Sequence, residues 1–176
     1  MSAYRAQIRG FTLIEVLIAL VILAFGMLSL ARAMGRSSQN EFEALQRSQA
    51  IVIAQEMVER LNANRKEAAL YVGDYSSSVT LQDCTVPPTL AARDRCQFEN
   101  RLFGADIVDA GKAIGAPLAA RACITSPGPN VYIVAVAWQG IVPTAPADSP
   151  CGVGTFDREE NRRVFSTIVQ IATLGA

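Results

Sequence analysis

The feature that most constrains this chain is an apolar run from Phe11 to Ala31, which reads FTLIEVLIALVILAFGMLSLA and contains a single charge, at Glu15. As a helix, with a rise of about 1.5 Å per residue, the run would be about 30 Å long, which is enough to span the apolar core of a bilayer. The segment before it carries Arg5 and Arg9 and no acid. Because basic residues flank the cytoplasmic end of a span, we expect this leader in the cytoplasm and the rest of the chain exported.

Two ordinary interpretations of this run leave part of it unexplained. A cleaved secretory signal would account for the A-x-A pattern at Ala31-Arg32-Ala33, but signal peptides have a shorter apolar stretch, of about 7–15 residues, and no use for a charge inside it. A plain membrane anchor accounts for the length but not for Glu15. Burying a charge near the middle of a membrane costs roughly 2.5–3.5 kcal/mol on insertion scales.

The residues from Arg9 to Glu15, read in order, resemble the type IV prepilin signature. They combine a short basic leader, a glycine before the cut, an aromatic first residue and a glutamate at the fifth mature position. The resemblance implies that prepilin peptidase cleaves after Gly10 at the cytoplasmic face and that the new amine of Phe11 is methylated. The apolar run is then retained. Cleavage removes two arginines and no acid, so the formal net charge changes from zero to −2.

Glu15 is interpreted as an assembly residue. Cleavage would create a cationic amine on Phe11, and Glu15 lies one helical turn further along. A carboxylate in lipid needs a partner, and the Phe11 amine of a neighbouring subunit would supply one. We therefore expect Glu15 to direct packing between subunits and not to act as a catalytic acid.

Composition argues against an enzyme and against a nucleic-acid-binding protein. Histidine is absent, which removes the commonest general base and the commonest zinc ligand. Basic and acidic residues balance at 16 each, so no strong positive field is available for nucleic acid. We expect no catalytic residue, no metal site and no cofactor. We interpret the charged Asp157–Glu160 stretch as a solvated loop and the serines Ser76–Ser78 as part of another loop. The aromatic residues Tyr132 and Trp138 are interpreted as core residues.

Four cysteines follow the export signal, at Cys84, Cys96, Cys123 and Cys151. An even number in an oxidising compartment indicates two disulfides, although a four-cysteine zinc site remains an alternative. Four cysteines permit three connectivities. Pairing between sequence neighbours, Cys84 with Cys96 and Cys123 with Cys151, is expected because each bond would then close one loop.

Periodicity predicts one long helix from Phe11 to Arg65, with no proline inside it. Its second half should pack on a head through positions at three- and four-residue spacing, namely Ala50, Ala54, Met57, Val58 and Leu61. A second helix is predicted from Thr89 to Leu102, with Ala91, Arg95, Phe98 and Leu102 on one face. Strands are predicted at Val131–Trp138, at Arg163–Thr173 and near Arg121–Ser126, the first two antiparallel. We expect loops at Tyr71–Val86, with an extended piece at Ser78–Leu81, and at Asp106–Ala116.

This pattern predicts an α+β, pilin-like fold in which a long N-terminal helix packs on a C-terminal antiparallel sheet. We expect a leader at 1–10, a membrane-spanning or fibre-core half-helix at 11–31, an amphipathic half-helix at 32–65 and a periplasmic head at 66–176. The stretch from Arg47 to Arg65 is similar to the helix end of the type IV pilus modification protein family, which are PilV-like minor pilins. Phe98, where tryptophan is expected, and Cys96 depart from that family.

The resemblance implies a minor pilin that is anchored in the inner membrane by one span and later lies at the tip of an extracellular pilus. There it would prime assembly for adhesion and twitching motility. Its partners would be other minor pilins, the major pilin and prepilin peptidase, with a tip adhesin as a further candidate. The main alternative is a minor pseudopilin of a type II secretion system. A DNA-binding pilin for uptake and a membrane-tethered enzyme rank lower, and no nucleic-acid partner is expected.

Overall fold

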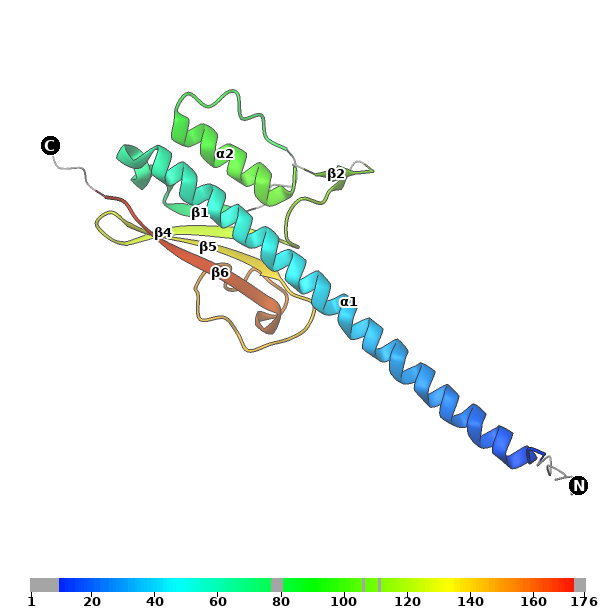
Figure 1. The fold of residues 1–176 in the computed structure, drawn as a ribbon. Helices are drawn as coiled ribbons and strands as arrows, with labels where there is room; N and C mark the ends of the chain where they lie inside the picture. Colours follow the sequence, from blue (N-terminus) through cyan, green and yellow to red (C-terminus); the bar gives the residue numbers. More distant parts are fainter. Residues whose placement is uncertain (1–9, 77–80, 106, 111, 173–176) are drawn as a thin grey trace, which may run out of the picture. The chain divides into compact units, whose positions relative to one another are not determined.

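The computed structural model describes residues 10–76, 81–105, 107–110 and 112–172 (Figure 1). Contacts divide the chain between Glu41 and Phe42 into two compact units, which are described separately. The N-terminal unit contains the first part of helix α1, Leu13–Ala63. The second unit, the head, contains the remainder of α1 and all the other elements. The fold is α+β, as predicted.

Helix α1 begins beside Thr12 and ends at Ala63, so it is two residues shorter at each end than predicted. The carbonyl of Thr12 accepts a hydrogen bond from the backbone N–H of Glu15 at 3.1 Å, and the Thr12 hydroxyl accepts a long one at 3.4 Å. Thr12 therefore caps the helix, because threonine oxygens satisfy N–H groups that the first turn leaves unpaired. The chain then turns through a 3-10 helix, η1, at Arg65–Tyr71.

The head contains a four-stranded sheet in the order β1-β4-β5-β6, with every neighbouring pair antiparallel. The strands are β1 (Gly73–Ser76), β4 (Arg121–Gly128), β5 (Val131–Gln139) and β6 (Arg162–Gln170). The predicted antiparallel pairing of the last two strands is confirmed. The predicted third strand is β4, which lies between β1 and β5 and pairs with both.

One face of the sheet packs against α1 and against α2, Leu90–Phe103 (Figure 1). The core on this face combines small residues of α1 with large residues of the strands and of α2. The side chains of Ile53, Met57, Leu61, Phe98, Leu102, Val134 and Val136 are almost fully buried there. Helix α2 begins where predicted, because the Thr89 side chain accepts a hydrogen bond from the backbone N–H of Ala92 at 3.2 Å.

The opposite face of the sheet is covered in part by the long connection between β5 and β6. Ala135, Ala137, Cys151 and Phe156 are buried in a second, smaller cluster, against which Cys123 and Val164 pack. The connection contains the 3-10 helix η2, Glu159–Asn161. The helices cover one face of β5 and this connection covers the other, which explains why the strand is apolar on both faces.

Several predicted loops and boundaries were wrong. Strand β1 lies inside the segment predicted as loop, whereas the extended piece expected at Ser78–Leu81 falls mainly outside the described residues. The 106–116 segment, also predicted as loop, contains the two-residue strands β2 (Val108–Asp109) and β3 (Lys112–Ala113). Strand β6 ends at Gln170 and not at Thr173.

The base of the β2–β3 hairpin brings two glycines together. Gly104 ends α2 in the left-handed region at φ 89°, and a Cβ atom there would lie 2.9 Å from the backbone nitrogen of Gly115. Only glycine fits such an approach in that conformation. The close approach of Gly104 to Gly115 therefore shapes the base of the β2–β3 hairpin. Glycines also make the sequence pattern of this segment look like a loop, which is why the hairpin was not predicted.

Candidate assembly site

The N-terminal unit presents Gly10, Phe11 and Glu15 at the start of α1. Gly10 and Phe11 precede the helix, Phe11 is 82% exposed, and Glu15 lies in the first turn. A Cβ atom added at Gly10 would meet nothing within 4 Å, so no contact within the described chain requires glycine here. Arg5 and Arg9 lie outside the described residues.

The helix that follows is apolar on all sides. Its most apolar window of 18 residues has a mean hydropathy of 2.7, and none of that window is buried within the chain. Among the described residues it is the one helix long and apolar enough to cross a membrane. A surface of exposed leucine, isoleucine and valine of this extent requires lipid or other protein around it. Glu15 is the one acid between Phe11 and Ala31, and it lies in the first turn of the helix.

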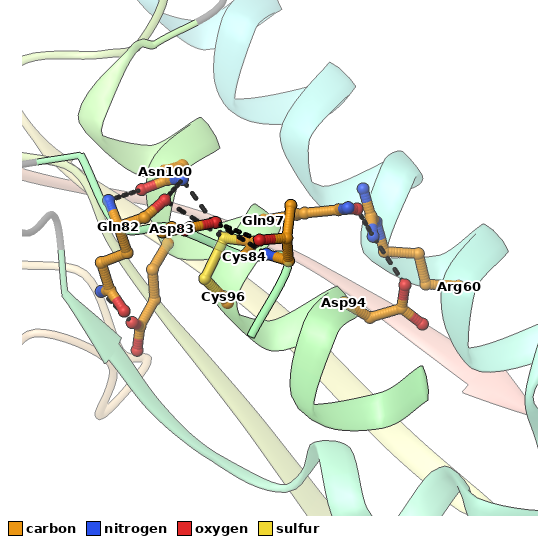
Figure 2. Close-up of a disulfide and its surroundings, with 10 residues drawn as sticks. Arg60, Gln82, Asp83, Cys84, Asp94, Cys96, Gln97 and Asn100 are labelled. Atoms are coloured by element: carbon orange, nitrogen blue, oxygen red, sulfur yellow. Dashed lines mark hydrogen bonds and ion pairs between the residues drawn. A yellow bond between two sulfur atoms is a disulfide. The ribbon is translucent and has the colours of Figure 1, made fainter. Parts of the chain in front are cut away.

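In the head, α1 is joined to α2 by charged side chains (Figure 2). The Arg60 guanidinium donates hydrogen bonds to Asp94 at 2.8 Å and to Gln97 at 2.9 Å, and it pairs with Glu56 on its own helix at 2.8 Å. On the other side, Glu56 pairs with Arg101 of α2 at 3.3 Å. These alternating charges fix how α2 lies along α1.

Two aromatic hydroxyls are buried beside this network. Burial, and after it the hydrogen bond to Asp94, raise the pKa of Tyr71 to about 12. Burial likewise raises the pKa of Tyr75 to about 12. The Tyr75 ring meets Phe98 edge-on at 5.3 Å between centroids, and the exposed Arg95 guanidinium lies 5.6 Å from the Tyr75 ring centroid. Arg95, predicted on the packed face of α2, therefore covers an aromatic ring at the edge of the core and is not itself buried.

The first disulfide, Cys84–Cys96, holds the segment after residue 80 against α2 (Figure 2). The same segment is held by Asn100, whose side-chain oxygen accepts from the backbone N–H of Gln82 at 2.9 Å and whose amide donates to the Gln82 carbonyl at 2.8 Å. The Asn100 side chain thus makes the two hydrogen bonds that a neighbouring strand would make. The segment is stapled covalently and by hydrogen bonds within a few residues.

The second disulfide, Cys123–Cys151, ties β4 to the connection between β5 and β6. Arg162, at the start of β6, is only 3% exposed, and its guanidinium donates to the carbonyls of Ala147, Ser149 and Cys151 at 2.7–3.0 Å. Glu159 pairs with it at 2.6 Å. Hydrogen bonds from the Gly154 N–H and from Arg162 hold the pKa of Glu159 below its usual value.

All four cysteines are used in these two bonds, which join sequence neighbours. No thiolate then remains for a zinc ion, so the four-cysteine zinc alternative does not apply.

Where α1 enters the head, two polar side chains hold distant loops. Glu43 accepts hydrogen bonds from the backbone N–H groups of Ile141 at 2.6 Å and Val142 at 3.3 Å, and Arg163 lies 3.8 Å from its carboxylate. Gln46, which is 2% exposed, accepts from the N–H of Leu118 at 3.0 Å. Sequence reasoning missed Glu43, Gln46 and Arg162, because nothing in the sequence around a polar or charged residue distinguishes a buried side chain that holds a loop from a solvated one.

The remaining sequence candidates lie where a structural role accounts for them. Tyr132 and Trp138 are buried in the core, so they offer no exposed ring on which a base could stack. Of the acidic stretch, Glu159 holds Arg162 and Glu160 pairs with Arg158 at 3.4 Å in an exposed position. Ser76 ends β1, and Ser77 and Ser78 lie outside the described residues.

Comparison with known families assigns the two halves of α1 separately. A family profile described as the prokaryotic N-terminal methylation motif matches residues 5–31, and one described as type IV pilin Tt1218 matches residues 33–100. No curated protein and no solved structure matches the chain significantly. The methylation motif therefore covers the chain from Arg5 through the exposed apolar part of α1, and the pilin match covers α1 from Ala33 onward together with α2 as far as Asn100.

Proposed function

The chain is a type IV pilin with an N-terminal methylation motif, a structural protein and not an enzyme, and on this premise we propose that it is a minor pilin that primes fibre assembly. Membership of this family implies assembly with other pilins and processing by prepilin peptidase. In the proposal the peptidase cleaves after Gly10 and methylates Phe11. The subunit then waits in the inner membrane as a single-pass protein with a periplasmic head, and it enters the extracellular pilus at the tip.

The observation that carries the proposal is the start of α1. An apolar helix that buries none of its most apolar window within its own chain and begins with one carboxylate has the chemistry of a segment that moves from lipid into a protein core. In lipid its apolar sides are solvated by acyl chains; in a fibre they would pack on the corresponding helices of neighbouring pilins. Glu15 is a cost in the first setting and an ion-pair partner in the second. This difference favours transfer into the fibre.

The assignment as a minor subunit rests on the residues from Arg47 to Arg65, which are similar to PilV-like minor pilins. The segment packs in the head through Ala50, Ile53, Ala54, Met57 and Leu61, and its Arg60 holds α2. The partners proposed are other minor pilins and the major pilin, with a tip adhesin as a further candidate. The near-neutral charge argues against DNA as a ligand.

The proposal is tested by deleting the chain and, separately, by epitope-tagging it at full length. We expect the deletion to reduce surface fibres at least about tenfold, and the tag to appear at one end of sheared fibres. Label along the whole fibre would assign a major pilin instead. Normal fibres together with loss of secreted enzymes from the medium would assign a pseudopilin of a type II secretion system.

A further inference from the structure

Strand β6 forms one edge of the sheet, since the strand order ends with it. It pairs with β5 along its full length, from Arg162 opposite Gln139 to Gln170 opposite Val131. Its other side faces no strand in the described part of the chain. An edge of this kind carries a row of backbone N–H and C=O groups that can pair with a further strand.

The hydrogen bonds at the two ends of β6 show which residues point outward. The Ile171 N–H donates to the Asn130 carbonyl at 2.8 Å, and the Asn161 carbonyl accepts from the Gly140 N–H at 2.7 Å. Odd-numbered residues therefore direct their backbone groups to β5, and the even-numbered ones direct theirs outward, because the two sides alternate along an antiparallel strand. The outward residues beyond the start of the strand are Val164, Ser166, Ile168 and Gln170. No hydrogen bond joins their outward groups to any described residue.

This edge lacks the features that normally protect an exposed strand. From Val164 to Gln170 it contains no charged residue and no proline, and its register with β5 is unbroken. The irregularity in the sheet lies elsewhere, between β4 and β5. Ile168 is 71% exposed on the face turned away from the helices. Natural proteins place lysine, proline or a bulge at such edges to prevent pairing, so an unprotected edge indicates that pairing is intended.

Beside this edge the outer face of the sheet is hollowed. A depression of about 350 Å³ is lined by Ile133, Ala135 and Ser166 and by the stapled connection around Cys151. Its exposed surface is mainly apolar. A strand added to β6 would direct every second side chain to this same face, beside Ile168 and near the depression.

The topology also determines how two heads could meet. With four strands all antiparallel, the edge strands β1 and β6 run in opposite directions. In two heads of this topology whose α1 segments after Glu41 lie parallel, corresponding strands run in the same direction along that axis. The β6 edge of one would therefore meet the first-strand edge of another in the antiparallel sense, which is the more stable pairing.

We propose that the outer edge of β6, from Val164 to Gln170, is a strand-addition site that binds an extended edge segment from the head of a neighbouring pilin. The backbone groups of the even-numbered residues provide the hydrogen bonds, and Ile168 provides an apolar contact. The inference rests on the proposed function in that the partner is another pilin in the same fibre. It adds a specific surface and a pairing geometry to that function.

The test uses the full-length chain in fibre-producing cells, with photoreactive benzoylphenylalanine in place of Gln170. After irradiation, cross-linked peptides from sheared fibres are sequenced by mass spectrometry. We expect links to an extended edge segment of another pilin head. The same probe in place of Val86, which is 75% exposed on the segment beside α2, serves as the control position and should not give that link.

Ser166→Pro distinguishes strand addition from simple proximity. Proline removes the outward N–H of residue 166 and leaves the hydrogen bonds to β5 intact, and prolines are tolerated at sheet edges. We expect the Gln170 cross-link to fall about tenfold, as loss of a hydrogen bond and of close strand approach implies, and to be unchanged in Ser166→Ala. Ile168→Lys, which places a charge at the edge without altering the backbone, should give the same loss, whereas Val86→Lys should not.

The amount of chain in the fibres separates the two proposals. If the chain is absent from fibres, the proposed function fails. If the chain is present in fibres but the probe at position 170 forms no cross-link, or cross-links to a helix, the strand-addition site is refuted and the pilin function stands. The same conclusion follows if the cross-link to a strand persists in both Ser166→Pro and Ile168→Lys.

Discussion

The hydroxyl of Tyr71 donates a hydrogen bond of 2.5 Å to the Asp94 carboxylate and accepts one of 3.1 Å from the Asn64 side chain. It thereby joins the end of α1 and the 3-10 helix that follows to α2. The same carboxylate receives Arg60, so one acid connects three separate elements of the head. The polar contacts between α1 and α2 therefore depend on the Asp94 carboxylate.

Alkaline pH should unfold the head through its buried tyrosines. The pKa values of Tyr71 and Tyr75 are raised to about 12 in the folded chain from an ordinary value near 10. The unfolded chain therefore loses these protons first, and the stability they contribute is complete below pH 10 and lost as the pH rises to 12. We expect the melting temperature of the full-length protein in detergent to fall across this window.

Tyr71→Phe should reduce that alkaline loss. The same variant should cost about 1–2 kcal/mol at pH 7, because it removes the hydrogen bond to Asp94 and leaves a buried carboxylate oxygen with fewer donors. Melting curves from pH 7 to 12 measure both effects. An unchanged pH profile in the Tyr71→Phe, Tyr75→Phe double variant would show that other groups cause the transition.

Gly10→Val should block processing and leave full-length precursor in the membrane. A Cβ atom at Gly10 would meet no atom of the described residues, so the fold of that part of the subunit should not change. The effect would arise in the peptidase, where an extended substrate next to lipid has little room for a side chain. Mass spectrometry of the membrane fraction identifies the N-terminus. A mature N-terminus at Phe11 in the variant would contradict the prediction, and a wild-type N-terminus at Met34 would favour a secretory signal instead.

Glu15→Val should be processed and inserted normally but should enter fibres poorly. Loss of the charge makes the span more apolar, so its residence in the membrane is not weakened. Only the ion pair with a neighbouring Phe11 amine is lost. The ratio of variant to wild-type protein in sheared fibres, against the membrane pool, is the measurement. Ile14→Val, which keeps the charge in the same turn, is the matched control and should incorporate fully; equal incorporation of Glu15→Val would remove Glu15 from assembly.

Loss of either disulfide should destabilise the head by a comparable amount. The bonded residues are 12 apart for Cys84–Cys96 and 28 apart for Cys123–Cys151. On the loop-entropy model, these spacings contribute about 3 and about 3.5 kcal/mol. We expect the paired serine variant of the second bond to unfold at slightly lower urea concentration than that of the first. Protein made in the cytosol should melt early or aggregate. Free thiols in periplasmic protein, found by non-reducing peptide mapping, would refute both bonds.

Elements with a strong and regular pattern could be predicted from the sequence. Helix α1 has no proline across its length, and β5 is β-branched and aromatic between turn residues. Helix α2 agrees with the helix predicted from Thr89 to Leu102, and Thr89 caps it. These signals are local, so neighbours in the sequence are enough to determine the conformation.

Features that depend on distant partners could not be predicted in this way. Strand β1 reads Gly-Asp-Tyr-Ser, without alternation, and it is a strand because it pairs with β4 and buries Tyr75. Glu43 and Arg162 are charged residues whose roles come from loop backbones about a hundred and about fifteen positions away. The same limit applies to the β6 edge, since a strand's place at the end of a sheet is decided by the order in which all strands pair.

The placement of the two disulfides has a mechanical consequence. Neither bond includes α1 or β6: one joins the segment before α2 to α2, and the other joins β4 to a connection. Suppose that a pulled fibre applies force to a subunit at α1 and at β6. The residues that the two disulfides enclose, over sequence separations of 12 and 28, then cannot be drawn out into extended chain. At about 3.3–3.6 Å per residue, this shortens its maximum extension by roughly 130 Å. The contacts of α1 with the sheet, which no covalent bond reinforces, are then the part of the head that yields under tension, while the two stapled regions remain closed.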